Sequence, residues 1–189
     1  MKISAEYLAE QDDCVRRNFA GYKKNLKDKQ TLLRLNTIKS FVSDGKSILS
    51  VGSGGIDPIF VGASHACDIS PVSGELLSSQ TWPGLFQTCS CDNLPYTDKQ
   101  FEFAYCTEVI EHLPTLEAVR MTFNELNRVS HHWIVTTPSI DVHEPTHKFL
   151  FKLAELGFLT SDIHGPRPVC IEQRGIFWYV HNGERKIFD

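Results

Sequence analysis

The sequence predicts an α/β fold built on a doubly wound, mostly parallel sheet of seven strands. Short β-like runs alternate with helical patterns through most of the chain, which is typical of a parallel sheet with helices on both faces. Two further β-like runs lie close together near the C-terminus and predict an antiparallel hairpin. With 189 residues, of which 41% are hydrophobic and 22% charged, the chain fits one compact globular unit.

The N-terminal part is predicted to form a helical cap over residues 1–45, followed by an α/β domain over residues 46–189. Thr31 is expected to cap the second helix of this part and Gly45 to end it. Lysines and arginines fill the remaining positions, and we expect them to form a solvated basic face. The apolar positions recur at helical spacing: Val15, Phe19, Tyr22 and Leu26, then Leu35, Ile38 and Val42.

The strands are predicted from apolar runs bounded by glycine, proline or acidic residues. Between them, Leu116–Leu126 and Leu150–Leu156 have apolar faces at helical spacing, the second with Gly157 as its expected C-cap. The short helix after the first strand is predicted to have one or two turns, with Asp57 as its cap and Pro58 at its first position. The seven predicted strands are 47–51, 65–68, 85–89, 101–106, 133–137, 168–171 and 175–180.

Charge and hydropathy exclude several classes of protein. The net charge of -4 argues against a mainly electrostatic nucleic-acid binder. Apolar runs of 18 or more residues are absent, so no membrane span is expected, and the first residues lack the apolar centre of a signal peptide. The six cysteines are therefore expected to be reduced thiols in a cytoplasmic protein.

Three polar features follow predicted strands at the edge where an open parallel sheet binds its ligands. The turn at residues 52–55, Gly-Ser-Gly-Gly, lets a backbone approach a ligand closely, although any tight turn favours glycine. Asp68 ends the second strand, where it would either accept hydrogen bonds from ribose hydroxyls or cap the helix that begins near Pro71. Asp92 lies in a predicted turn and offers an acceptor for an exocyclic amine.

Three segments, taken with this glycine turn, resemble the class I S-adenosylmethionine-dependent methyltransferases, which have a Rossmann-like fold. The resemblance extends from about Lys46 to Pro138 and is closest to the small subgroup of ubiquinone and menaquinone biosynthesis methyltransferases, known as type 11. The three segments are Asp68-Ile69-Ser70-Pro71, the run from Asp92 to Glu102 (DNLPYTDKQFE), and Glu108-Val109-Ile110-Glu111-His112-Leu113.

The resemblance implies S-adenosylmethionine as cofactor, S-adenosylhomocysteine as product, and SN2 displacement of a methyl group onto a small-molecule acceptor. It assigns the methionine part of the cofactor to the turn formed by Gly52, Ser53, Gly54 and Gly55. Asp68, next to Ile69, would hold the ribose hydroxyls. Adenine would lie against Asp92, Asn93 and the backbone of Leu94, and the sulfonium against Thr107 and Glu108.

Two departures from the family pattern fall on the methionine end. Ser50 replaces the usual acid, and Ile56 replaces the usual third glycine. The loss of one charge-assisted hydrogen bond costs about 1.5–3 kcal/mol, or one to two decades of affinity. The sequence therefore predicts weak cofactor binding, and it leaves an alternative: a catalytically degenerate domain that binds a nucleoside or a partner protein.

Glu108 and His112 are the candidate catalytic residues, with His112 either a general base or a hydrogen-bonded structural group. His143 and His147 follow the fifth strand and are the candidate substrate contacts. No metal site is predicted. Glu108 and His112 stand at i and i+4, a geometry that could hold a metal, but no third ligand of suitable spacing is evident; Cys89 and Cys91 with the two later histidines match no familiar pattern. The short chain predicts a thin lid over the pocket, or a homodimer whose second subunit completes it.

Overall fold

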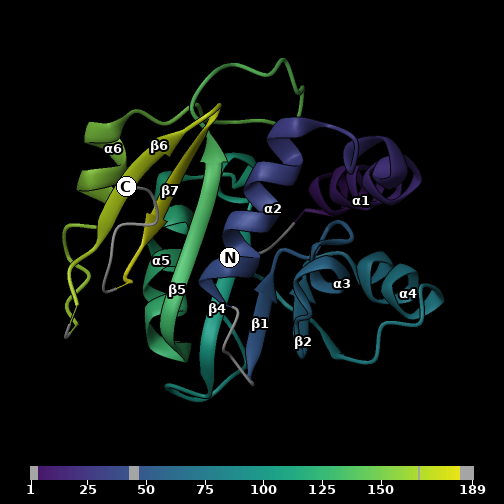
Figure 1. Ribbon diagram of the computed structural model, residues 1–189, viewed down its shortest axis with the longest axis horizontal. Helices are drawn as coiled ribbons and strands as arrows, with labels where there is room; N and C mark the ends of the chain where they lie inside the picture. The colour runs from purple at the N-terminus through teal and green to yellow at the C-terminus, as the bar shows by residue number, and fades with distance from the viewer. Residues whose placement is uncertain (1–3, 43–46, 166, 184–189) are drawn as a thin grey trace.

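The computed structural model describes residues 4–42, 47–165 and 167–183 (Figure 1). Among these residues, seven strands form one sheet in the order β3-β2-β1-β4-β5-β7-β6. β7 runs antiparallel to its neighbours β5 and β6, and the other neighbouring pairs are parallel. The predicted fold class is confirmed. The strands are β1 Ile48–Val51, β2 His65–Asp68, β3 Leu85–Thr88, β4 Phe101–Thr107, β5 Ser130–Pro138, β6 Cys170–Arg174 and β7 Phe177–His181.

Helices cover both faces of this sheet. α2 and α3 lie on one face, seen in front of the strands in Figure 1, while α5 and α6 lie on the other. α1 packs against α4 beside β2 through Val15, Phe19, Val72 and Leu77. The bounds are α1 Ala5–Asn25, α2 Lys29–Phe41, α3 Asp57–Val61, α4 Pro71–Ser79, the 3-10 turn η1 Ile110–His112, α5 Leu116–Val129 and α6 Leu153–Leu159.

The central strands are buried on both faces because successive side chains point in opposite directions. In β4, Ala104 and Cys106 pack towards α5, whereas Tyr105 packs towards α2. In β5, Trp133 and Val135 face the α5 side and Ile134 the α2 side. The near-continuous apolar runs that predicted these strands follow from this two-sided burial.

The structure corrects three predicted helix ends. Asp28, not Thr31, caps α2, and its carboxylate accepts from the Thr31 amide at 2.7 Å. α3 begins at Asp57, which leaves that carboxylate free of a capping bond. Gly157 lies inside α6, which ends at Leu159. The predicted end at Gly45 falls outside the described residues.

The structure also bears on the expectations about the cysteines and about membrane spans. All six cysteines are free thiols, three of them buried. Among the described residues, no helix combines the length and the apolar character that crossing a membrane requires.

Candidate functional site

The candidate site lies at the carboxyl ends of β1, β2 and β4. The strand order reverses at β1, because β2 lies on one side of it and β4 on the other, and such switch points bind ligands in open α/β sheets. Two adjoining hollows open there, both lined by Asn18, Gly52, Gly54 and Glu108. We call them the Asp68 lobe and the Arg34 lobe, after the charged residue that distinguishes each.

The glycine turn forms the floor between the two lobes. Gly52 has a φ of +73°, and its amide and that of Ser53 both donate to the Cys67 carbonyl, at 2.8 and 3.0 Å. The Ser53 side chain is buried and donates to the Ser50 hydroxyl at 3.1 Å, so neither serine side chain lines a lobe. The turn therefore offers backbone to a ligand, as predicted, but no side chain from Ser53. Gly55 lines only the Arg34 lobe.

Asp68 and Ile69 line the Asp68 lobe. One Asp68 carboxylate oxygen accepts from the Ser70 amide at 2.8 Å, while the N-cap of α4 is Ser70 itself. The other oxygen, Oδ2, points towards Gly54, 3.9 Å from where a Cβ of that residue would lie. Burial raises the pKa of the Asp68 carboxyl to about 7, and Asp12 on α1 adds to the rise. A half-satisfied buried carboxylate is suited to receive hydroxyl donors.

The loop between β3 and β4 contributes Asp92 to the Asp68 lobe, together with Cys89 and Cys91. The Ser90 hydroxyl hydrogen-bonds to the Asp92 carboxylate. Asn93 is exposed and lines neither lobe. The Leu94 amide donates to Glu125 at 2.6 Å, so it is not free to contact adenine. Of the three predicted adenine contacts, the structure thus brings Asp92 to the pocket and leaves Asn93 and Leu94 outside it.

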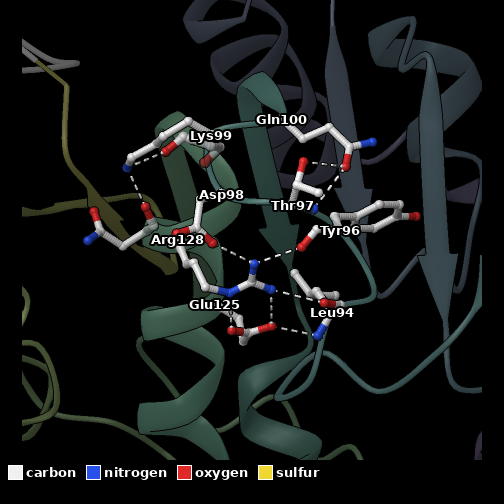
Figure 2. Close-up of polar contacts among 10 residues, drawn as sticks. Leu94, Tyr96, Thr97, Asp98, Lys99, Gln100, Glu125 and Arg128 are labelled. Atoms are coloured by element: carbon white, nitrogen blue, oxygen red, sulfur yellow. Dashed lines mark hydrogen bonds and ion pairs between the residues drawn. The ribbon is translucent and has the colours of Figure 1, made fainter.

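The same loop is held in place from α5, as Figure 2 shows. The Arg128 guanidinium donates to the carbonyls of Leu94 and Tyr96, at 2.9 and 2.7 Å, and to the Asp98 carboxylate at 3.0 Å. Glu125 accepts from the same guanidinium at 2.7 and 2.8 Å. These two side chains fix the loop that carries Asp92. Neither was predicted as part of the site, because in the sequence both resemble solvated residues of an amphipathic helix.

Arg128→Met is expected to lower the free energy of unfolding by about 1–3 kcal/mol, because several charged hydrogen bonds are lost at a partly exposed site. The loop should loosen, and adenosine binding should weaken because Asp92 is no longer held. Denaturant unfolding and calorimetry would measure the two effects. Arg120→Met, which removes a surface arginine of the same helix paired with Asp162, is the matched control and should change neither quantity appreciably.

The last residue of β4 and the residue that follows it reach the two lobes. Thr107 lines the Arg34 lobe and donates from Oγ1 to Asp57 at 2.7 Å. Glu108 has a φ of +55°, unusual for a residue with a side chain, and such strain clusters at functional sites. Its Oε1 accepts from Thr136 Oγ1 at 3.0 Å, and burial raises the pKa of its carboxyl.

The three candidate histidines separate in the structure. His112 lines the Asp68 lobe, and burial lowers its pKa to about 4, which makes it a weak base. His147 packs edge-on against it, with ring centroids 4.7 Å apart. His143 lines neither lobe; its side chain is 90% exposed beside Asp141. Neither His143 nor His147 therefore lines a lobe, but the structure brings His147 into contact with His112 at the edge of the site.

The N-terminal helices supply residues that were not predicted from the sequence. Tyr7, Gln11, Cys14 and Val15 of α1 line the Asp68 lobe, and the Tyr7 hydroxyl donates to the His112 carbonyl at 3.2 Å. Arg34 of α2 is buried in the second lobe, 3.2 Å from Asp57. Its Nε has no hydrogen-bond partner among the described residues. The predicted solvated basic face is therefore wrong at Arg34.

Comparison with known proteins agrees with the resemblance in the sequence. The family described as "Methyltransferase domain" matches residues 49–132. None of the curated proteins matches the sequence. The resemblance to the class I methyltransferases of type 11 is confirmed by the family match and by the shared fold of the solved structures.

Many solved structures share the fold. A possible histamine N-methyltransferase from Thermotoga maritima superimposes with a TM-score of 0.66 and 15% identity, over 93% of this chain and 100% of that one. The N-methyltransferase NodS from Bradyrhizobium japonicum, in complex with S-adenosylhomocysteine, superimposes with a TM-score of 0.63 and 14% identity, over 92% of this chain and 99% of that one. The 1,6-didemethyltoxoflavin-N1-methyltransferase of Burkholderia thailandensis superimposes with a TM-score of 0.62 and 16% identity, over 96% of this chain and 90% of that one.

Proposed function

The chain carries a class I methyltransferase domain at residues 49–132, and on that premise we propose that it transfers the methyl group of S-adenosylmethionine to a small-molecule acceptor. The observation that carries the proposal is the pair of lobes joined over the glycine turn. One offers a carboxylate to a ribose, and the other offers opposite charges to an amino acid. A nucleoside linked to methionine has this sequence of groups.

The Asp68 lobe suits the adenosine part of the cofactor. Asp68 would accept hydrogen bonds from both ribose hydroxyls through its unoccupied lone pairs, and Asp92 would accept one from the exocyclic amine of adenine. Val109, Leu113 and Ala118 supply apolar surface for the ring. The lobe thus combines apolar walls with few polar groups, as small-molecule sites do.

The Arg34 lobe suits the methionine part. The Arg34 guanidinium, whose Nε has no partner in the described part of the chain, would bind the carboxylate of the cofactor. Asp57 and Glu108 would accept from its ammonium group. The negative charge that is absent at Ser50 is thus supplied by Asp57, which the Arg34 and Thr107 side chains hold in place. We therefore expect the cofactor to bind more tightly than the weak affinity predicted from Ser50 alone.

The acceptor would enter beside His112, under α1, where Tyr7 and Gln11 line the pocket. Methyl transfer from a sulfonium depends mainly on in-line positioning and exclusion of water, which a helix lying over the pocket provides. Two of the similar structures are named as N-methyltransferases and a third as a possible one, and one of the three has the small molecule 1,6-didemethyltoxoflavin bound, in accord with a small acceptor here. The homodimer and the cytoplasmic location stay predictions.

Calorimetry with S-adenosylmethionine, S-adenosylhomocysteine and adenosine tests the proposal. We expect both cofactor forms to bind at least about tenfold more tightly than adenosine, because one extra charge-assisted contact is worth about that factor. Equal binding of all three would favour the nucleoside-binding alternative. Absence of binding up to millimolar ligand would contradict the proposed function.

Arg34→Met is expected to weaken S-adenosylhomocysteine binding about 10- to 100-fold while leaving adenosine binding within about twofold, because only the former reaches the Arg34 lobe. Arg34→Lys keeps a charge beside Asp57 but loses the planar fork, so an intermediate loss is expected. Calorimetry with both ligands would measure the effects. A parallel loss for adenosine would indicate a general collapse of the pocket instead of a methionine contact.

A further inference from the structure

Three ligating side chains meet at the edge of the Asp68 lobe. Glu111 and His112 come from η1, and His147 comes from the loop that follows β5. Each offers one donor atom, and the three donor atoms lie within 4.8 Å of one another. His112 also lines the lobe, so this cluster adjoins the proposed cofactor pocket.

Glu111 is the member that most needs a further partner. Its side chain is fully buried, and its Oε2 accepts from Thr137 Oγ1 at 3.1 Å, while its Oε1 has no hydrogen-bond partner within residues 4–42, 47–165 and 167–183. A buried carboxylate oxygen without a partner is costly unless a cation or a proton meets it. Burial and the nearby Glu108 raise the pKa of the Glu111 carboxyl.

The two histidines are in the form that binds metals. The Nδ1 of His112 is buried, and no described residue forms a hydrogen bond with it. Burial lowers the pKa of both imidazoles, which favours the neutral ring whose lone pair binds a metal. The two rings pack edge-on, and the nitrogen that each offers lies within 4.8 Å of the other.

Backbone hydrogen bonds fix the cluster in advance. The Glu111 carbonyl accepts from the amides of Lys148 and Phe149, at 2.7 and 3.2 Å, which ties the loop after β5 to η1. The His147 amide donates to the Glu144 carbonyl at 3.0 Å. A site on two segments that are already joined loses little entropy when it binds an ion.

We propose that Glu111, His112 and His147 bind one divalent transition-metal ion beside the cofactor pocket. Two imidazoles and one carboxylate suit Zn²⁺, Mn²⁺, Fe²⁺ or Co²⁺ and leave coordination positions for water or an acceptor oxygen. Bonds of about 2.1 Å place donor atoms roughly 3–4 Å apart, so the cluster would tighten by about an ångström. An ion here would polarise an acceptor hydroxyl, a role that His112 fills poorly as a base.

The test needs no cofactor and no methyl acceptor, so its result is separate from that of the proposed function. The chain is freed of metal with a chelator and titrated with Co²⁺ and Mn²⁺ by calorimetry, and the visible spectrum of the Co²⁺ form is recorded. We expect one ion per chain with a dissociation constant of about 10 μM or tighter. Glu111→Gln and His147→Ala should each weaken binding by at least about 100-fold.

His143→Ala is the matched control, because His143 lies in the same loop but is exposed and outside the cluster; it should bind as the wild type does. Should Glu111→Gln fail to fold, the half-buried His147 still provides the deciding variant. Full-strength binding by His147→Ala, no binding up to millimolar metal, or Co²⁺–thiolate absorption, which would place the ion on cysteine, would each overturn the proposal.

Discussion

Asp68→Ala is expected to weaken adenosine and S-adenosylhomocysteine binding by the same factor, at least about tenfold and up to several hundredfold. Two charge-assisted hydrogen bonds to the ribose hydroxyls would each contribute about 1.5–3 kcal/mol. Part of this gain is offset because the buried carboxyl must first lose its proton. Calorimetry at pH 8, where the carboxyl is mostly ionised, would measure the full effect.

Asp68→Asn separates charge from shape. Its amide oxygen can still accept from the Ser70 amide, so the start of α4 should be kept while the negative charge is lost. We expect Asp68→Asn to bind both ligands almost as poorly as Asp68→Ala. Unchanged affinity in a folded variant, judged by circular dichroism, would leave Asp68 with only its local role beside Ser70.

Because the Asp68 carboxyl can gain or lose a proton, both the stability of the fold and the affinity for adenosine should depend on pH. The pKa of the Asp68 carboxyl is about 7 in the free chain and about 4 when unfolded. Because the folded value is the higher one, protonated Asp68 favours the fold, and this contribution is lost as the pH rises from about 4 through 7. Ligand hydroxyls instead need the ionised form. Adenosine affinity should therefore rise about tenfold between pH 6 and pH 8, and Asp68→Asn should abolish most of that rise.

The strands could be predicted because a strand buried on two faces is an apolar run, and most such runs end at or next to a glycine, a proline or an acidic residue. β2 was predicted at its observed bounds, since Asp68 closes it. β6 begins at Cys170, two residues after the predicted start, and Pro168, which has no N–H to donate to a strand neighbour, lies outside it. The end of α6 was missed because Gly157 tolerates a helical interior, and Thr160 follows as the actual cap.

The site could be predicted only where its residues lie at or after the carboxyl end of a strand. Asp68 ends β2, Asp92 lies in the loop after β3 and Glu108 follows β4, so their convergence follows from the parallel sheet. Arg34 gave no such signal, because its charge is met by Asp57 from a different helix. The pairing of Glu111 with His147 likewise depends on how the loop after β5 folds back onto η1, which no local spacing encodes.

Gly52→Ala is expected to be the most damaging single change at the glycine turn. Gly52 has a φ of +73°, and a Cβ there would lie 2.3 Å from Cγ2 of Val109 and 3.0 Å from its Cγ1. The strained backbone costs about 1–2 kcal/mol, and overlap with a packed side chain adds about 1–3 kcal/mol. Denaturant unfolding should show a loss of about 2–5 kcal/mol. Because Gly52 lines both lobes, cofactor binding should also weaken in whatever fraction stays folded.

Gly62→Ala isolates the backbone component of this effect. Gly62 has a φ of +85°, but apart from the adjoining chain no heavy atom of the described residues lies within 4 Å of the place that a Cβ would occupy, and Gly62 lines neither lobe. The free energy of unfolding of Gly62→Ala should fall only by the cost of the strained backbone, about 1–2 kcal/mol, and the variant should keep its affinity for S-adenosylhomocysteine. Adding Val109→Ala to Gly52→Ala should recover part of the overlap cost, giving a favourable coupling in a double-mutant cycle. Equal losses for the two glycine variants, with no coupling to Val109, would mean that the turn tolerates a side chain and that its close approach to Val109 does not shape the pocket.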